Sequence, residues 1–439
     1  MSTMTPTTDL REELKNFDPE IHEALVGEEN RQRTGMELFA SENYVSPAVL
    51  AALGTVFTNK YSEGYPGKRY YGGQEYTDVI ERVAIERATK LFGCDHANVQ
   101  VLSGAAANIA TFFSWLEPGD TVLGMDLSHG GHLTHGHPVT YIAKIFKFVR
   151  YKTDIETGAI DYDELRRVAK EHKPKIILAG FSAYPRDLDY ARFREIADEV
   201  GAVAMADMAH IAGLIAGGVL KNPFDYGFNI MTTTTHKSLR GPRGAMVLTK
   251  GTVGNPLKKT EKTIENIPTL VDRMVFPGLQ GGPHMHQVAA IAVALKEALQ
   301  PDFKTYAAQV VKNAQALADE LLKMDWKLFT GGTDNHLVLA DVVASTGVGG
   351  KLAQQTLDDV GITTNKNAYP DDTRTPFDPS GVRFGTPAVT TRGMKEDDMR
   401  RVARWIDQAL RGADDQAMLT KMKTEIEEFC NGFPVPGIS

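Results

Sequence analysis

A regular alternation of short apolar segments with segments of helical spacing, from about residue 93 to residue 248, most constrains the fold of this chain. The apolar segments are residues 99–102, 121–125, 175–180, 202–206, 230–235 and 245–248. The intervening segments, such as 106–116 and 190–200, carry apolar residues at helical spacing. Strands separated by helices are typical of a mostly parallel sheet that helices cover on both faces. We therefore predict an α/β fold with a large domain built on a mostly parallel mixed sheet.

The two ends of the chain differ from this central pattern. Residues 9–32 are charged, with apolar residues at helical spacing, and predict an N-terminal helical arm. A glycine-rich turn at 278–283 precedes long helical patterns at 286–298 and 303–324. Beyond it, strands are predicted at 326–329, 336–341 and 381–384, and helices at 352–360, 396–410 and 417–429. The expected organisation is an arm at 1–65, a large domain at 66–292 and a smaller C-terminal α+β domain at 293–439.

Two of the predicted strands end in polar residues that indicate one site. Strand 230–235 is followed by His236 and Lys237, and strand 202–206, one crossover earlier, by Asp207 and His210. In open α/β folds, ligands bind where the carboxyl ends of neighbouring parallel strands meet. A lysine there, with a carboxylate to hold a ring nitrogen, indicates a Schiff-base enzyme that uses pyridoxal 5′-phosphate (PLP). Alone, the lysine would fit a surface position and the aspartate a helix cap.

Two further segments suit the charged groups of such a cofactor and its substrate. Ser103, Gly104 and Ala105 follow a strand and open a helix, where backbone N–H groups and the helix dipole favour a phosphate. Arg383 carries a planar guanidinium that fits a carboxylate bidentately, which makes it a candidate for the α-carboxylate of an amino acid. An interdomain salt bridge is the alternative for Arg383.

A loop at 128–137 contains histidines at every third residue, as a metal site might. Its glycines favour a close-packed loop instead, and Asp126 is the nearest carboxylate in sequence. We therefore predict no metal site.

These segments together resemble serine hydroxymethyltransferases, a family of PLP enzymes of fold type I, the aspartate aminotransferase type. The resemblance covers residues 37–409. It implies the reversible conversion of L-serine and tetrahydrofolate to glycine and 5,10-methylenetetrahydrofolate through a Schiff base with PLP. It also implies a homodimer with shared active sites, with pairing of dimers into tetramers left open.

The resemblance also implies roles for individual residues. Catalysis is expected of Lys237, Glu63, Asp207, His132, His210 and Tyr71. Cofactor contacts are expected of Ser103, Gly104, Ala105, His132, Ser182, Asp207, His210, His236, Lys237, Tyr61, Gly281 and Gly282. Substrate contacts are expected of Ser41, Glu63, Tyr71 and Arg383, and folate contacts of Leu127, Gly131, Leu133 and Asn367. In the family, the segment that carries Tyr61, Glu63 and Tyr71 reaches the active site of the other subunit.

The composition restricts partners and compartment. A net charge of −8 provides no basic field for nucleic acid or an anionic membrane. No apolar run approaches the roughly 18 residues of a membrane span, and the first residues are not a signal peptide. Cys94 and Cys430 lie far apart and form no metal or redox motif, which fits a reducing cytoplasm. We predict a cytoplasmic protein with small-molecule partners and neither nucleic-acid nor membrane partners.

Departures from the family pattern keep other substrates open. Leu102, Ala105 and Ala106 are expected near the cofactor, where the family commonly carries a second hydroxyl residue. An α-methylserine hydroxymethyltransferase and a threonine-type aldolase for 3-hydroxy amino acids therefore remain alternatives. From another class, a regulatory or RNA-binding protein that kept the fold is disfavoured, because the residues for chemistry are present and the net charge is acidic.

Overall fold

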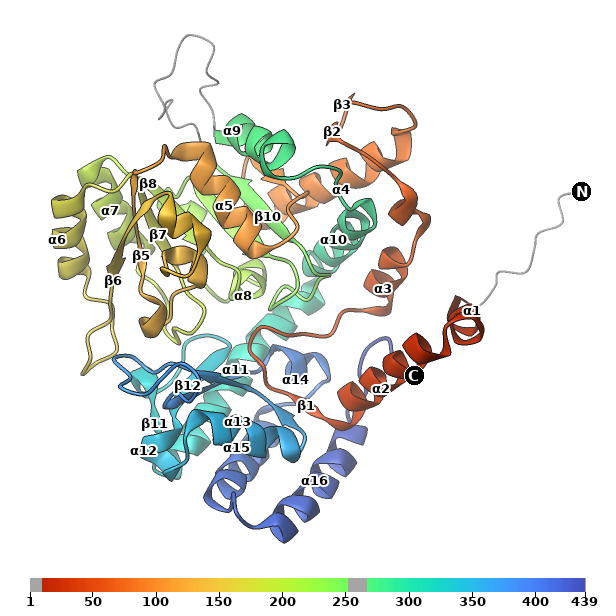
Figure 1. Ribbon diagram of the computed structural model, residues 1–439, viewed down its shortest axis with the longest axis vertical. Helices are drawn as coiled ribbons and strands as arrows, with labels where there is room; N and C mark the ends of the chain where they lie inside the picture. Colours follow the sequence, from red (N-terminus) through yellow and green to blue (C-terminus); the bar gives the residue numbers. More distant parts are fainter. Residues whose placement is uncertain (1–9, 252–266, 439) are drawn as a thin grey trace, which may run out of the picture.

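The computed structural model describes residues 10–251 and 267–438 (Figure 1). The basic residues at 258–262, whose composition favours a solvated loop, lie outside the described residues, as does most of the charged segment at 260–271. The rest of that segment begins helix α9 (Ile267–Arg273). Within the described residues, no helix combines the length and the apolar character needed to cross a membrane.

A seven-stranded sheet organises the larger part of the chain, in the order β4-β10-β9-β8-β7-β5-β6. Its strands are β4 (His96–Asn98), β5 (Thr121–Met125), β6 (Lys147–Tyr151), β7 (Ile176–Gly180), β8 (Val203–Asp207), β9 (Ile230–Thr234) and β10 (Ala245–Thr249). The pairs among β5 to β9 are parallel, and β10 runs antiparallel to both its neighbours. The predicted mostly parallel mixed sheet is confirmed.

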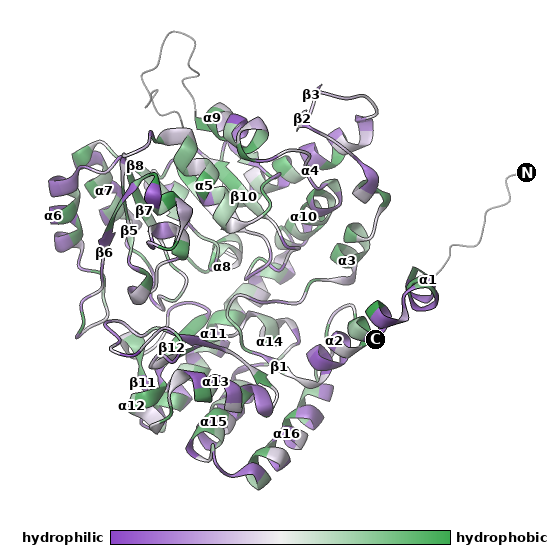
Figure 2. Ribbon diagram, viewed as in Figure 1, coloured by the Kyte–Doolittle hydropathy of each residue, from purple (hydrophilic) through white to green (hydrophobic). Residues whose placement is uncertain are grey.

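Helices bury both faces of this sheet, which explains the nearly continuous apolar strands. In β8, Val203 and Met205 pack with α5 (Gly104–Trp115) and α9 on one face. Ala204 and Ala206 point to the other face. That face is covered by α4 (Glu75–Phe92), α6 (Tyr162–His172), α7 (Tyr190–Val200), α8 (Ala212–Ala216) and α10 (Met285–Ala298). Hydrophobic colour follows the interior strands, and hydrophilic colour the outside of α6 (Figure 2).

A smaller antiparallel sheet lies below the large one in Figure 1, in the order β11-β12-β15-β14. Its strands are β11 (Lys327–Leu328), β12 (Leu337–Asp341), β14 (Asn365–Asn367) and β15 (Gly381–Gly385). A second hydrophobic cluster joins it to α13 (Gly350–Asp359), α15 (Glu396–Arg411) and α16 (Gln416–Asn431). Helix α11 (Pro301–Lys323) contributes its first half to the large cluster and its second half to this one.

The N-terminal segment begins with α1 (Leu10–Phe17) and α2 (Pro19–Thr34), as the apolar spacing predicted. Asp18 separates the two helices and caps α2 by accepting from the N–H of Ile21. The chain then forms β1 (Met36–Glu37), which pairs in parallel with β13 (Ile362–Thr363) in a separate two-stranded sheet and thus ties the segment to the C-terminal part of the chain. Helix α3 (Pro47–Leu53) follows and packs against α10.

The strand predicted at 99–102 was wrong, because β4 ends at Asn98. The N–H of Ala245 in β10 still donates to the carbonyl of Val101 at 3.0 Å, and a side chain pairs the backbone on either side of Val101. Gln280 Nε2 donates to the carbonyl of Gln100 at 2.9 Å, and Gln280 Oε1 accepts from the N–H of Leu102 at 3.2 Å. Strand β6, helix α4 and strand β14 were not assigned from the sequence. The charged residues Lys147 and Arg150 obscure the apolar pattern of β6.

Candidate active site

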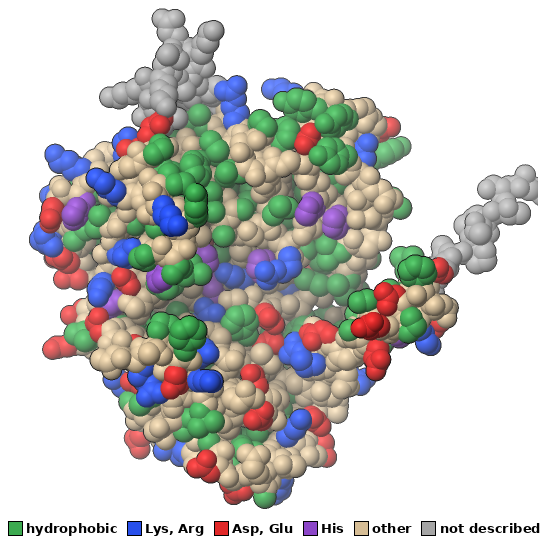
Figure 3. All heavy atoms as spheres, in the orientation of Figure 1, with side chains coloured by type: hydrophobic (Ala, Val, Ile, Leu, Met, Phe, Trp, Pro, Cys, Tyr) green, Lys and Arg blue, Asp and Glu red, His purple; other side chains and the backbone are tan. Residues whose placement is uncertain are grey.

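The polar ends of β8 and β9 face one cavity, as the sequence predicted. Lys237 follows β9, and Asp207 is the last residue of β8, which pairs in parallel with β9. A cavity of about 300 Å³ is lined by the predicted residues Ser41, Ser103, Gly104, Ala105, His132, Ser182, Asp207, His236 and Lys237. Histidine and basic side chains gather along the hollow between the two parts of the molecule (Figure 3).

A second cavity, of about 400 Å³, shares Lys237 and His132 with the first. Its lining includes the predicted residues Ser41, Leu127, Gly131, Leu133, Ser182, His210, Asn367 and Arg383. The structure thus brings most of the proposed cofactor residues, Arg383 and Ser41, and the proposed folate residues to two adjoining cavities.

Asp207 is held as a carboxylate. Its Oδ2 accepts from Asn108 Nδ2 at 2.8 Å and from His135 Nε2 at 3.0 Å, and its Oδ1 accepts from the N–H of Ala209 at 3.2 Å. Burial alone would raise the pKa of Asp207, but the hydrogen bonds from His135 and Asn108 lower it below its ordinary value. An ionised carboxylate here can hold a protonated ring nitrogen.

Lys237 is buried, and burial lowers the pKa of its amine to about 8, partly opposed by the negative charge of Asp207. The positive charge of Arg383 lowers that pKa further. A larger fraction of the amine is therefore neutral near physiological pH than in an ordinary lysine, and the neutral amine is the nucleophile toward an aldehyde.

We expect this low pKa to control cofactor attachment. The rate at which the apoprotein forms its coloured PLP adduct should rise with pH up to about 8, because more of the Lys237 amine becomes neutral, and then level off. Stopped-flow absorbance measures that rate. A rate that keeps rising tenfold per pH unit to pH 10 would show an amine with the ordinary pKa of about 10.4.

Arg383 is a buried cation without a carboxylate partner in the described residues. Its Nε donates to Asn365 Oδ1 at 3.1 Å, its Nη2 to Ser41 Oγ at 3.1 Å, and its Nη1 to the carbonyl of Ser182. Burial lowers its pKa to about 10. Two of its five N–H groups remain available, so the site suits an incoming carboxylate.

His210 belongs to a pair of buried imidazoles that the sequence did not reveal. Its Nδ1 lies 3.2 Å from Nε2 of His336, and its Nε2 lies 3.4 Å from Ser41 Oγ. Burial holds the pKa of His210 well below its ordinary value and lowers that of His336 to about 3, so both rings are neutral. His336 therefore connects the small sheet to the residues beside Lys237.

The residues at one end of the first cavity fit a phosphate. Ser103 caps α5, and its Oγ accepts from the N–H of Ala106 at 3.3 Å. A Cβ on Gly104 would lie 2.8 Å from Thr234 Cγ2, so glycine permits close packing. Nδ1 of His236 is buried without a hydrogen-bond partner in the described residues. Arg243, which the sequence analysis did not assign, also lines the cavity and supplies a cation.

One group of possible metal ligands lies beside the cavity. The ligand atoms of His132, His135 and Asp207 are within 4.8 Å of one another. His135 and Asp207 already hydrogen-bond each other, and Asp207 also accepts from Asn108. A cation would have to displace these bonds, so the absence of a metal site stays our prediction.

The remaining predicted residues form a second cluster. The hydroxyls of Tyr61 and Tyr71 donate to Glu63 at 3.2 and 2.9 Å. A Cβ on Gly281 would lie 3.4 Å from Glu63 Oε1, and one on Gly282 would lie 3.1 Å from Tyr61 Cε2. Both tyrosines are more than half exposed. None of these five residues lines the two cavities at Lys237.

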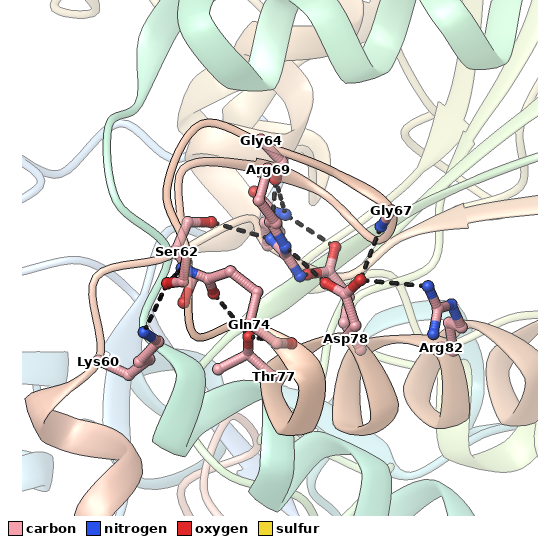
Figure 4. A network of polar contacts seen from close by, with 12 residues as sticks. Lys60, Ser62, Gly64, Gly67, Arg69, Gln74, Thr77, Asp78 and Arg82 are labelled. Carbon is pink, nitrogen blue, oxygen red and sulfur yellow. Dashed lines mark hydrogen bonds and ion pairs between the residues drawn. The ribbon is translucent and has the colours of Figure 1, made fainter.

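Arg69 fixes the backbone on both sides of Glu63 (Figure 4). Its Nη1 donates to the carbonyls of Ser62 and Gly64, each at 2.9 Å. Its Nε donates to Asp78 Oδ1 at 2.9 Å, and its Nη2 to Glu81 Oε2 at 2.5 Å. The guanidinium is buried, so this network leaves little freedom to the segment that presents Glu63.

The variant Arg69→Met should lower the free energy of unfolding by about 3 kcal/mol or more, because it leaves Asp78 and Glu81 without their buried partner. Chemical denaturation measures this loss. Arg82→Met is the matched control, because exposed Arg82 contacts the same Asp78 at 3.1 Å and should cost about 1 kcal/mol or less. Equal losses in the two variants would contradict the role of Arg69.

Comparison with known proteins supports the motifs found above. Residues 14–406 match the family model described as serine hydroxymethyltransferase. The chain is also similar to a protein of Koribacter versatilis (strain Ellin345) named serine hydroxymethyltransferase. The two are 52% identical over 426 residues, which span 97% of this chain and 96% of the relative.

Proposed function

The chain belongs to the serine hydroxymethyltransferase family, and from this premise we propose that the cleft at Lys237 is where it converts L-serine and tetrahydrofolate reversibly to glycine and 5,10-methylenetetrahydrofolate. The family is PLP-dependent and uses tetrahydrofolate as co-substrate, so the protein is a PLP-dependent one-carbon transferase of fold type I. One observation carries the assignment of the cleft. Lys237 and an ionised Asp207 end adjacent parallel strands and face the same cavity.

When bound, PLP would withdraw electrons from Cα of the amino acid and so allow the Cα–Cβ bond of serine to break. Lys237 would hold the cofactor through its amine, and Asp207 would keep a hydrogen on the ring nitrogen. Ser103, Gly104, His236 and Arg243 would bind the phosphate. Ring stacking by the neutral His132 would orient the cofactor.

The substrates would be positioned from the small sheet and the loop after β5. Arg383 and Ser41 would bind the α-carboxylate of serine, which brings the anion that the buried guanidinium lacks. Leu127, Gly131, Leu133 and Asn367 would contact tetrahydrofolate in the outer cavity. Holding both substrates in a fixed orientation would raise the rate, because the reacting atoms stay close together and correctly aligned.

A substrate panel tests the function. The purified enzyme should convert L-serine to glycine much faster with tetrahydrofolate than without it. Turnover of L-threonine that is indifferent to folate would instead indicate the aldolase, and preferential turnover of α-methylserine would indicate the other hydroxymethyltransferase.

We also propose a homodimer in which Glu63, Tyr61, Tyr71, Gly281 and Gly282 complete the partner's active site. These residues lie outside the cavities of their own Lys237, and the exposed tyrosines offer an apolar surface next to them. Glu63 would then move protons for the reaction in the partner's cleft.

Mixing two inactive variants tests this sharing. Dimers of Lys237→Ala with Glu63→Gln, formed by mixed refolding, should recover about a quarter of wild-type activity, because half the dimers would have one complete site. Each variant refolded alone is the control. No recovery in a mixture whose heterodimers are demonstrated by mass would mean that each chain supplies its own Glu63.

Two further assignments remain proposals. The division into an arm at 1–65, a large domain at 66–292 and a small domain at 293–439 is supported by the two sheets with separate hydrophobic clusters. A cytoplasmic location is supported by the buried free thiols of Cys94 and Cys430.

A further inference from the structure

A single amide side chain, that of Asn108 on α5, joins two ligand-facing groups of the cleft. Asn108 is 1% exposed, and its Nδ2 donates to Asp207 Oδ2 and to Thr134 Oγ1, each at 2.8 Å. Its Oδ1 accepts from the hydroxyl of Thr232 at 2.7 Å. An ionised carboxylate only accepts hydrogen bonds, so the nitrogen of the amide, and not its oxygen, must face Asp207.

This orientation fixes the direction of the next hydrogen bond. Thr134 Oγ1 accepts from Asn108, so its own hydrogen is directed to Nδ1 of His132, 2.7 Å away. The backbone N–H of Thr134 donates to the same Nδ1 at 3.2 Å. A ring nitrogen that receives these donors carries no hydrogen, so in the neutral ring the hydrogen lies on Nε2.

His135 has the same tautomer for a similar reason. Its Nδ1 accepts from the backbone N–H of His132 at 3.1 Å, so Nε2 carries the hydrogen that it donates to Asp207 at 3.0 Å. In the described residues, the donors to Asp207 are therefore a neutral ring, the Asn108 amide and the N–H of Ala209. Burial lowers the pKa of His132 to about 4, which keeps that ring neutral as well.

We propose that Asn108 is a positioning residue that orients Asp207 and, through Thr134, locks His132 as a hydrogen-bond donor at Nε2. Within the described residues Nε2 of His132 has no hydrogen-bond partner, and His132 lines both cavities. The free N–H would donate to an oxygen of the bound amino acid. Because Nε2 of His132 already carries a hydrogen, this nitrogen cannot take a proton from serine. The role in turnover rests on the proposed function.

Nitrogen-15 NMR of histidine-labelled holoenzyme reads the protonation site directly, with the His132 signal identified by its loss in His132→Gln. The expected result near neutral pH is hydrogen on Nε2 alone. Hydrogen on Nδ1, or on both nitrogens, would overturn the proposal. This measurement needs no turnover, so a failure of the proposed function and a failure of the tautomer assignment are distinguishable.

An isosteric variant tests the role of the amide. Asn108→Asp places a carboxyl beside Asp207, and one of the two must take up a proton before it can donate. Relative to wild type, cofactor affinity should fall about tenfold or more at alkaline pH and recover toward acid pH, since one unit of pKa is a tenfold effect. Leucine cannot donate a hydrogen bond at any pH, so Asn108→Leu should bind the cofactor weakly at every pH.

Comparing the cofactor affinity of each variant with that of wild type at the same pH cancels the effects of the other titratable groups. The charged or titratable groups that face this pair are His132 and His135 from the loop after β5, Lys237 after β9 and Arg383 on β15. All are present in each protein. An Asn108→Asp protein that matches wild type at every pH, or matches Asn108→Leu at every pH, would overturn the role of Asn108. Far-UV circular dichroism and thermal unfolding of the variants establish that they fold.

Discussion

Replacement of Lys237 by alanine is expected to lower kcat by about 10³-fold or more, the largest effect of any single substitution in this chain. The amine is buried, and its pKa of about 8 makes it the nucleophile of the cleft. Without it, only the proposed contacts to the phosphate, the ring nitrogen and the ring face would hold PLP. Steady-state formation of glycine from serine measures the activity, and the absorbance of dialysed protein measures retained cofactor.

Lys250 provides a control for this substitution, because it follows strand β10 on the same sheet but lines neither cavity. Lys250→Ala should retain wild-type turnover. If Lys237→Ala kept even a tenth of wild-type kcat, or held its cofactor through dialysis as a covalent adduct, another amine would be responsible for attachment.

The second large effect is expected at Arg383. Arg383→Leu should lower kcat/KM for serine by about 3 kcal/mol, or about 150-fold, because the α-carboxylate would lose its buried guanidinium partner. Arg383→Lys should recover little of this loss, because an ammonium cannot reproduce the planar fork. Uptake of PLP should change far less, because Asp207, Lys237 and the proposed phosphate-binding residues are untouched.

Arg392 is the matched control for Arg383. It is also buried, but its guanidinium donates to backbone carbonyls, including those of Gly35, Arg33 and Cys430. Arg392→Leu should therefore lower stability, measured by denaturation, without a selective change in the KM for serine. A loss in kcat/KM at Arg392 as large as at Arg383 would mean that both arginines act through folding.

The candidate site residues whose positions could be predicted from the sequence lie at the ends of regular elements. Asp207 ends one strand of strong apolar pattern and Lys237 follows another, and a parallel sheet brings such ends together. Arg383 was found by its chemistry, and the structure adds that three of its N–H groups are already bonded. Their common feature is a polar side chain at a predictable place in the fold.

The polar residues of the cleft that were missed have contacts distant in sequence. Asn108 lies on a helix of mainly apolar and small residues. A single amide there does not indicate a functional position until the structure shows Asp207 and Thr134 beside it. His336 likewise precedes an ordinary buried strand. The false strand at 99–102 has a related origin, because Gln280, whose side chain pairs the backbone of Gln100 and Leu102, is far along the chain.

The central claim is that PLP is attached to Lys237 in the cleft between the two sheets. Borohydride reduction of the holoenzyme, followed by proteolysis and mass spectrometry, locates the attachment directly. We predict a phosphopyridoxyl group on the peptide that contains Lys237, at close to one per chain, and none on that peptide from Lys237→Ala. A label on a different lysine, or a wild-type protein that gains no phosphopyridoxyl group after incubation with PLP, would contradict the account.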